Sequence, residues 1–323
     1  MSCQQTFVLG GESRMAVTIT EICKKGARAI LMENDSLSAV ILPENGGKID
    51  SLICRETGME LLFQNPKEKY ADASFGSSFE AFEACGFDDA FPNVDAEEPY
   101  PDHGEIWSAS FESRYCGEIL DLSYESTRFG YRYCKKIWLE QNRLCIRYTI
   151  LNTRRTPFPA IWTMHCLCNT EPDMKIVFPP GTHKVITVFD NELTGEKERI
   201  LPFPEADIDG HVYHFDRVPE HGAVKYFCAG AVAEGFCGYD YPSKDTKVRF
   251  IYDARLLPYL GFWVTAGGFR GDHNCALEPT NGFYDSISKA RRLGGGCPEL
   301  LPGKPLEFDM TIQMDRLSKP VSG

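Results

Sequence analysis

The sequence is short of basic residues and lacks any long apolar run. Its 323 residues include 34 lysines and arginines against 46 aspartates and glutamates, which gives a net charge of -12. Nucleic acids and anionic membrane surfaces bind basic patches, so this balance disfavours both as partners. No stretch approaches the roughly 20 apolar residues of a membrane-spanning helix. A neutral small-molecule substrate is compatible with this composition.

A targeting signal and a Cys-x-x-Cys motif are also missing. The first residues, MSCQQTFVLGGESRMAV, lack the basic segment and following apolar segment of a secretory signal. The 13 cysteines are scattered singly without a Cys-x-x-Cys, and Cys166 and Cys168 are the closest pair. Disulfide scaffolds are short and dense in cysteine. We therefore expect reduced, mostly buried cysteines, no disulfide, no zinc site and a cytoplasmic location.

What dominates the chain is an alternation of apolar and polar residues. In RLCIRYTILN (143–152), Leu144, Ile146, Tyr148 and Ile150 fall on one face of an extended strand. The same pattern or a strand-like composition recurs at 36–44, 105–113, 130–140, 246–253 and 305–314. Period two with a polar face predicts half-buried antiparallel sheet. The 28 glycines and 20 prolines separate these runs, as turns in a sandwich or barrel do.

Helix signals are few. Residues 72–84 could hold one helix, and residues 284–296 a short one that begins after Asp285 or Ser286 and has basic residues in its last turn. The polar, proline-rich segment 202–222 is typical of a long surface loop. No linker or internal repeat divides the chain. We predict one all-β domain over residues 1–323, a large antiparallel sandwich with few short helices.

A glutamate at the end of an apolar strand is the first candidate functional residue. In CALEPTNGFYDS (275–286), Glu278 follows a small apolar run and precedes Pro279, which ends the strand. Burying an unpaired carboxylate is costly, so this position needs an explanation. Glu278 either belongs to a site or caps the following turn.

Two of the seven histidines also stand out. His103 begins HGEIW, where an irregular segment enters a strand, and His165 lies inside the apolar pattern AIWTMHCLCN. A histidine in such a strand is either a satisfied core residue or a site residue on a rigid element. The other five lie in loop-like or turn-like contexts and are expected to be solvated: His183, His211, His214, His221 and His273.

Six stretches occur in an order that connects these candidates. They are LSAVILPENGGKIDSLICRETGMELLFQ (37–64), GFDDAFPNV (86–94), HGEIW (103–107), MHCLCN (164–169), LPYLGFWVTAGGF (257–269) and ALEPTNG (276–282). The ordered set resembles the galactose mutarotase-like superfamily, in particular the aldose 1-epimerase family and its less characterised relatives. The resemblance extends over residues 16–314.

The resemblance implies a fold and a reaction. Family members are large antiparallel β supersandwiches with a sugar cleft, and they interconvert the α and β anomers of free sugars without a metal or an organic cofactor. It implies that Glu278 is the general base and that His165, followed four residues later by Asn169, is the general acid. It also implies that His103, before Gly104, contacts the ring oxygen or neighbouring hydroxyls.

This chemistry is plausible on its own terms. An aldose ring opens when the anomeric hydroxyl loses a proton and the ring oxygen gains one. Rotation about the bond between the first two carbons, followed by closure, yields the other anomer. An ionised carboxylate and a charged imidazole on opposite sides of the hemiacetal can make both transfers.

Further candidates for substrate contacts have alternative structural roles. Asp88 and Asp89 could bind sugar hydroxyls or form a capping pair. Trp107 and Trp263 could stack on a sugar ring or belong to the core. Arg270 could reach an anionic group or lie at a loop tip. The residues between His165 and Asn169 are two cysteines and a leucine, where sugar mutarotases usually have an aromatic pair. This departure leaves the sugar undefined.

Three other functions remain open. An epimerase of phosphorylated hexoses should have basic residues that converge on the cleft, for which Arg270, Lys244 and Lys184 are candidates without a clustered motif. A non-catalytic carbohydrate-binding protein could share the fold. A glycoside hydrolase or lyase needs a second carboxylate opposite Glu278, and Glu105 is one candidate besides the two aspartates. The sequence does not predict an oligomeric state.

Overall fold

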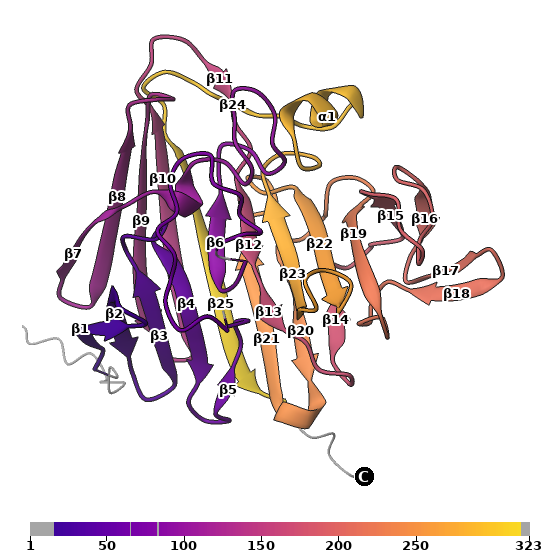
Figure 1. The fold of residues 1–323 in the computed structure, drawn as a ribbon, viewed down its shortest axis with the longest axis horizontal. Coiled ribbons are helices and arrows are strands. Elements are labelled where there is room, and N and C mark those ends of the chain that lie inside the picture. The colour runs from indigo at the N-terminus through magenta and orange to yellow at the C-terminus, as the bar shows by residue number, and fades with distance from the viewer. Residues whose placement is uncertain (1–15, 65, 83, 318–323) are drawn as a thin grey trace, which may run out of the picture.

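Two large antiparallel sheets, stacked on each other, form the body of the molecule (Figure 1). The computed structural model describes residues 16–317 except 65 and 83. The first sheet has the order β1-β2-β3-β4-β6-β12-β23-β22-β19-β15-β16, with β5 beside β4 and β13 beside β23. Its strands are β1 (Thr18–Lys24), β2 (Ala27–Glu33), β3 (Leu37–Leu42), β4 (Lys48–Cys54), β5 (Met59–Glu60), β6 (Phe87–Ala90), β12 (Thr163–Cys166), β13 (Cys168–Asn169), β15 (Lys184–Thr187), β16 (Ile200–Pro202), β19 (Gly222–Cys228), β22 (Tyr259–Ala266) and β23 (His273–Thr280).

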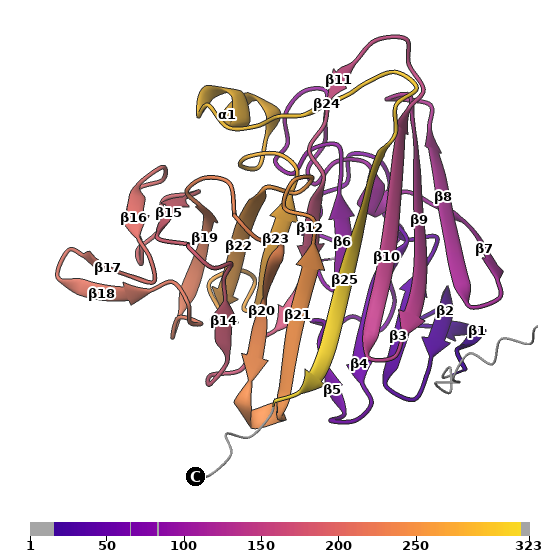
Figure 2. The same ribbon diagram turned by 180° about the vertical axis from the view of Figure 1, so that it is seen from behind.

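The second sheet covers one face of the first and lies in front in Figure 2. In spatial order its strands are β14 (Lys175–Val177), β20 (Phe236–Tyr241), β21 (Thr246–Tyr252), β25 (Leu306–Arg316), β10 (Arg143–Asn152), β9 (Tyr131–Glu140), β8 (Ile119–Ser126) and β7 (Glu112–Cys116). Two small sheets pair β11 (Phe158–Pro159) with β24 (Glu299–Leu300) and β17 (Glu205–Ile208) with β18 (His211–His214). The helices are η1 (Ile106–Ser108), η2 (Pro242–Lys244) and α1 (Ile287–Arg292).

The core lies between the two large sheets. Leu144, Ile146, Tyr148 and Ile150 of β10 are all 0% exposed, which confirms the alternation predicted from the sequence. Tyr148 stacks on Phe308 of β25 with ring centroids 4.8 Å apart. The period-two pattern therefore places one face of each strand against the opposite sheet, and the predicted antiparallel sandwich is confirmed.

Three local predictions are wrong. Residues 105–113 do not form one strand: η1 comes first, where the Ala109 N–H donates to the Ile106 carbonyl at 3.0 Å, and β7 begins only at Glu112. The described residues of 72–84 form turns, and Gly76 has a φ of 83° that a helix does not accommodate. Segment 202–222 contains the hairpin β17–β18, which projects from the body in Figure 1.

The helix predicted near residues 284–296 is present as α1. The Ser286 side chain accepts a hydrogen bond from the Lys289 backbone N–H at 3.4 Å, as an N-cap does. Within the described residues, no helix has the length and apolar character needed to cross a membrane. Twelve cysteines fall in that part of the chain and form no disulfide there, while Cys3 lies outside it.

Candidate active site

Alternation in three central strands brings His165, Lys225 and Glu278 to one face of the first sheet. The flanking residues Met164 and Leu277 belong to the core between the sheets. Because successive side chains in a strand point to opposite faces, His165 of β12 and Glu278 of β23 point away from that core. The same reasoning applies to Lys225 of β19, whose neighbours Val224 and Tyr226 are core residues.

Glu278 is 0% exposed and forms an ion pair with Lys225, with 3.1 Å between Oε2 and Nζ. Neither carboxylate oxygen accepts a hydrogen bond of good geometry from the described residues. Burial raises the pKa of Glu278, and the nearby Asp285 adds to this, while Lys225 opposes it. The structure thus holds a buried carboxylate whose charge depends on one lysine.

A glycine on the neighbouring strand makes room for this carboxylate. Gly261 of β22 pairs with Glu278 across the sheet. A Cβ at Gly261 would lie 3.0 Å from Oε2 of Glu278 and 3.1 Å from Cζ of Phe227. A larger residue would therefore crowd the carboxylate.

The two candidate histidines lie edge to face, with ring centroids 4.8 Å apart. Phe79 contacts both: it stacks on His103 at 4.2 Å and meets His165 edge-on at 4.9 Å. Asp102 Oδ1 is 2.8 Å from His103 Nδ1, and its Oδ2 accepts the Phe79 backbone N–H at 3.2 Å. Asp102 therefore fixes both the imidazole and the segment that covers it.

The two histidines differ in their polar surroundings. His165 is buried, and its Nδ1 has no partner among the described residues. Burial lowers the pKa of His165 well below its ordinary value, and the positive charges of His103, Lys225 and Lys48 act in the same direction. Burial acts to raise the pKa of Asp102, but the hydrogen bond and charge of His103 lower it overall. The resting site thus has a neutral His165 beside the hydrogen-bonded pair of Asp102 and His103.

These side chains border a cavity of about 230 Å³. That is below the roughly 300–1,000 Å³ of pockets for drug-sized ligands, so it suits a ligand of monosaccharide size. The Trp263 indole is fixed by a hydrogen bond from Nε1 to Asn274 Oδ1 at 3.1 Å. The lining combines aromatic and polar residues: Phe79, Glu80, Ala84, Asp102, His103, His165, Leu167, Trp263, Phe269 and Asn274.

Of the predicted site residues, the structure brings His103, His165 and Trp263 to the cavity, with Glu278 on the same face. Asp88 also shares the face of His165, and its carboxylate lies 2.8 Å from Lys48 Nζ. Arg270 lies beside the cavity, where it donates to the Glu80 carbonyl and faces Asp272 at 3.6 Å.

Three other candidates have structural roles. Asp89 points into the core, where it pairs with Lys135 at 2.8 Å and accepts a hydrogen bond from Tyr148 at 2.9 Å. The Asn169 amide donates to backbone carbonyls of residues 60 and 62 at 3.0 and 3.1 Å. Trp107 is 2% exposed and packs edge-on against Phe79 without lining the cavity.

Sequence reasoning missed Phe79, Asp102, Lys225, Asn274 and Asp285. Asp102 directly precedes His103, so this neighbour was a usable signal. Lys225 is a lone charge in the apolar run AVKYFC, which is the same signal that identified Glu278. The others depend on which strands and loops meet in space, and no local pattern shows that.

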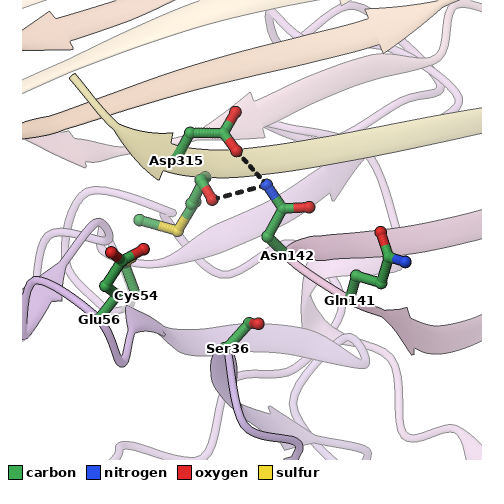
Figure 3. A pocket seen from close by; sticks show the side chains of 7 residues that line it. Ser36, Cys54, Glu56, Gln141, Asn142 and Asp315 are labelled. Carbon is green, nitrogen blue, oxygen red and sulfur yellow. Dashed lines mark hydrogen bonds between the residues drawn. The ribbon is translucent and has the colours of Figure 1, made fainter. Parts of the chain in front are cut away.

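A larger hollow of about 510 Å³ lies at the turns between the sheets (Figure 3). Within its lining the Asn142 amide donates to the Met314 carbonyl at 3.1 Å and to Asp315. Its lining holds no histidine: Ser36, Cys54, Glu56, Gln141, Asn142, Met314 and Asp315. Volume alone therefore does not mark the site. The described residues also contain no group of three or more histidine, cysteine or acidic side chains that could hold a metal ion.

The stacked sheets form a β-sandwich whose fold is similar to that of solved galactose mutarotase-like proteins. A galactose mutarotase-like protein from Clostridium acetobutylicum matches with a TM-score of 0.67 at 15% identity, over 93% of this chain and 99% of that one. A galactose mutarotase related enzyme from Lactobacillus acidophilus matches with a TM-score of 0.63 at 14% identity, over 95% of this chain and 100% of that one. At such identities the likeness concerns the fold alone.

The amino-acid sequence assigns the chain to a family. Residues 16–284 match the family model described as Domain of unknown function (DUF5107), and the chain belongs to that family. No curated protein matches the chain.

Proposed function

We propose that this chain is an aldose 1-epimerase-like enzyme that interconverts the α and β anomers of an unphosphorylated sugar. The observation that supports the proposal is that His103 and His165 line one cavity of monosaccharide size, while Glu278 lies on the same face of the first sheet as His165. Trp263, held by Asn274, supplies an aromatic face of the kind on which sugars stack. The mutarotase-like fold of the relatives supports the same reaction class.

In the proposed reaction Glu278 takes the proton of the anomeric hydroxyl while an imidazolium gives one to the ring oxygen. The resemblance implies that His165 is this acid, yet its lowered pKa makes it neutral in the resting site. His103 is fixed through Nδ1 by Asp102 and lines the cavity, which leaves its Nε2 for a ligand. We therefore propose His103 as the group that donates to the ring oxygen and give His165 a hydrogen-bonding role at the ring. Closure of the rotated open chain reverses both transfers.

Charge in the cavity favours a neutral sugar over a sugar phosphate. Apart from the histidines, the ionisable lining residues are Glu80 and Asp102, which repel an anion. The Arg270 guanidinium already contacts Glu80 and Asp272, and Lys244 pairs with Glu171 at 2.9 Å. The Glu278 carboxylate itself is covered in this structure, so substrate entry requires side chains above it to move.

The test is the anomerisation rate of freshly dissolved aldoses, followed by polarimetry or anomer-resolved NMR exchange. The wild type should accelerate at least one sugar. Glu278→Gln, which keeps the shape but not the base, should lose about 10²–10⁴-fold, and His103→Asn should lose a similar factor. His211→Asn, exposed on the projecting hairpin, is the matched control and should change little. Full activity in Glu278→Gln would refute the mechanism, and saturable sugar binding without catalysis would favour the carbohydrate-binding alternative.

A further inference from the structure

Lys225 lies between two buried carboxylates. Its Nζ is 3.1 Å from Glu278 Oε2 and 3.0 Å from Asp285 Oδ1. The two acidic side chains are 0% and 1% exposed, whereas the lysine side chain is 12% exposed. Lys225 is thus the member of the triad nearest to solvent, and both carboxylates depend on it for a counter-charge.

The other charges near the triad do not replace this lysine. Asp95 and Lys289 both act on Asp285, but they form an ion pair with each other. His103 acts on Glu278 electrostatically and is hydrogen-bonded to Asp102. Burial alone would lower the pKa of Lys225, but Asp285, Glu278 and Asp95 raise it overall, so the lysine stays charged.

We propose that Lys225 is a positioning residue that keeps Glu278 in its carboxylate form, and that Asp285 holds Lys225 in place when Glu278 becomes neutral. This inference rests on the proposed function, because it gives Glu278 the role of base. When Glu278 accepts the proton of the anomeric hydroxyl, its negative charge disappears. Lys225 keeps its own proton and remains paired with Asp285, so no ammonium is left buried without a partner. Return of the proton restores the original pairing.

Removal of the two supporting residues should affect Glu278 in opposite directions. Without Lys225, the buried carboxylate loses its cation, so Glu278 should bind its proton up to a higher pH. Without the charge of Asp285, the repulsion between the two carboxylates is removed and Lys225 pairs with Glu278 alone. Glu278 should therefore lose its proton at a lower pH. A lysine that only fills space predicts neither shift.

The experiment follows the carboxyl ¹³C resonance of Glu278 against pH in protein labelled at the glutamate side-chain carboxyl. Glu278→Gln identifies the resonance by its loss. In Lys225→Met the titration midpoint should rise by about one pH unit or more, and in Asp285→Asn it should fall. Lys244→Met, which breaks only the exposed pair with Glu171, is the matched control and should leave the midpoint unchanged.

Activity provides the second readout. If the wild type anomerises a sugar, the acidic limb of its pH–rate profile should move with the NMR midpoint in each variant. If the wild type anomerises none while the two midpoints move in opposite directions, the proposed function fails and the charge arrangement stands. Equal midpoints in wild type and Lys225→Met, or a rise in Asp285→Asn, would overturn the inference. If Lys225→Met does not fold, the direction of the shift in Asp285→Asn decides.

Discussion

Gly261 shows how a residue without a side chain can determine a site. Because a Cβ there would lie 3.0 Å from Oε2 of Glu278, Gly261→Ala should displace the carboxylate from its place beside Lys225. We expect a loss of about 1 kcal/mol or more in the free energy of unfolding and an activity loss on the order of tenfold to a hundredfold. Urea denaturation and the anomerisation rate measure the two effects.

The control for Gly261→Ala is the same substitution in a Glu278→Ala background. With the carboxylate gone, the added methyl group still meets Phe227 but no longer Oε2, so the stability cost should be smaller than in the wild type. An equal cost in both backgrounds would show that the glycine accommodates Phe227 and not the proposed base.

Substitution of Asp89 distinguishes a role in the core from a role in sugar binding. Asp89→Asn leaves Lys135 as a buried ammonium without its carboxylate. The free energy of unfolding should therefore fall by about 3–5 kcal/mol, while the affinity of the folded fraction for sugar should not change. Asp309→Asn is the control, because its pair with Arg147 is about half exposed and contributes within about 1 kcal/mol. A weaker sugar affinity with normal stability would make Asp89 a substrate contact after all.

At the scale of elements, the segment that carries Phe79 depends on Asp102 at the beginning of the turn before η1. Asp102→Asn keeps the side-chain shape but weakens the hydrogen bonds to His103 Nδ1 and to the Phe79 amide. Hydrogen bonds to charged groups contribute roughly 1.5–3 kcal/mol. Hydrogen exchange at the Phe79 amide should accordingly accelerate about tenfold or more.

Asp207→Asn is a suitable comparison for this exchange experiment. Asp207 accepts the Gly210 amide at 2.8 Å in the projecting hairpin, away from the site. Its substitution should leave exchange at Phe79 unchanged. If Asp102→Asn also leaves it unchanged, the segment over the histidines is held by the aromatic contacts alone.

The elements themselves could largely be predicted, because alternation is a local property. The predicted strand at 143–152 coincides with β10, and the short helix after Ser286 is present. The strand predicted at 105–113 is wrong because the chain makes a 3-10 turn at Ile106–Ser108, closed by the Ala109 N–H on the Ile106 carbonyl, and residue alternation does not reveal such a turn.

The site could be predicted only in part. Glu278 and His165 stand out because each is a polar residue in an apolar strand, and His103 because of its place before a strand. Lys225 and Asp285 acquire a role only through the pairing of β19, β22 and β23, since Lys225 and Glu278 are brought together by strand order. Asp88 and Asp89 are adjacent in sequence, yet alternation sends them to opposite faces.

At the scale of the whole molecule, the buried ionisable groups of the site make stability change with pH in opposite directions. Burial raises the pKa values of Glu278 and Asp285 above those of the unfolded chain. Between the pKa of these carboxyl groups in the unfolded chain and their higher pKa in the folded protein, the folded state binds more protons than the unfolded chain. The free energy of unfolding therefore falls as the pH rises through this window. His165 has the opposite effect because its pKa is lowered in the folded state.

The contribution of His165 to the pH dependence of stability can be measured at acidic pH. Below the ordinary histidine value, near pH 6.5, the unfolded chain binds a proton that the buried imidazole does not, so stability should fall as the pH decreases. One group of this kind changes the free energy of unfolding by at most about 1.4 kcal/mol per pH unit. Urea denaturation at pH 5 and pH 8 should therefore show a smaller difference for His165→Asn than for the wild type. His211→Asn, whose side chain is exposed, should retain the wild-type difference, and an equal loss of stability in all three proteins would place the acid sensitivity elsewhere in the molecule.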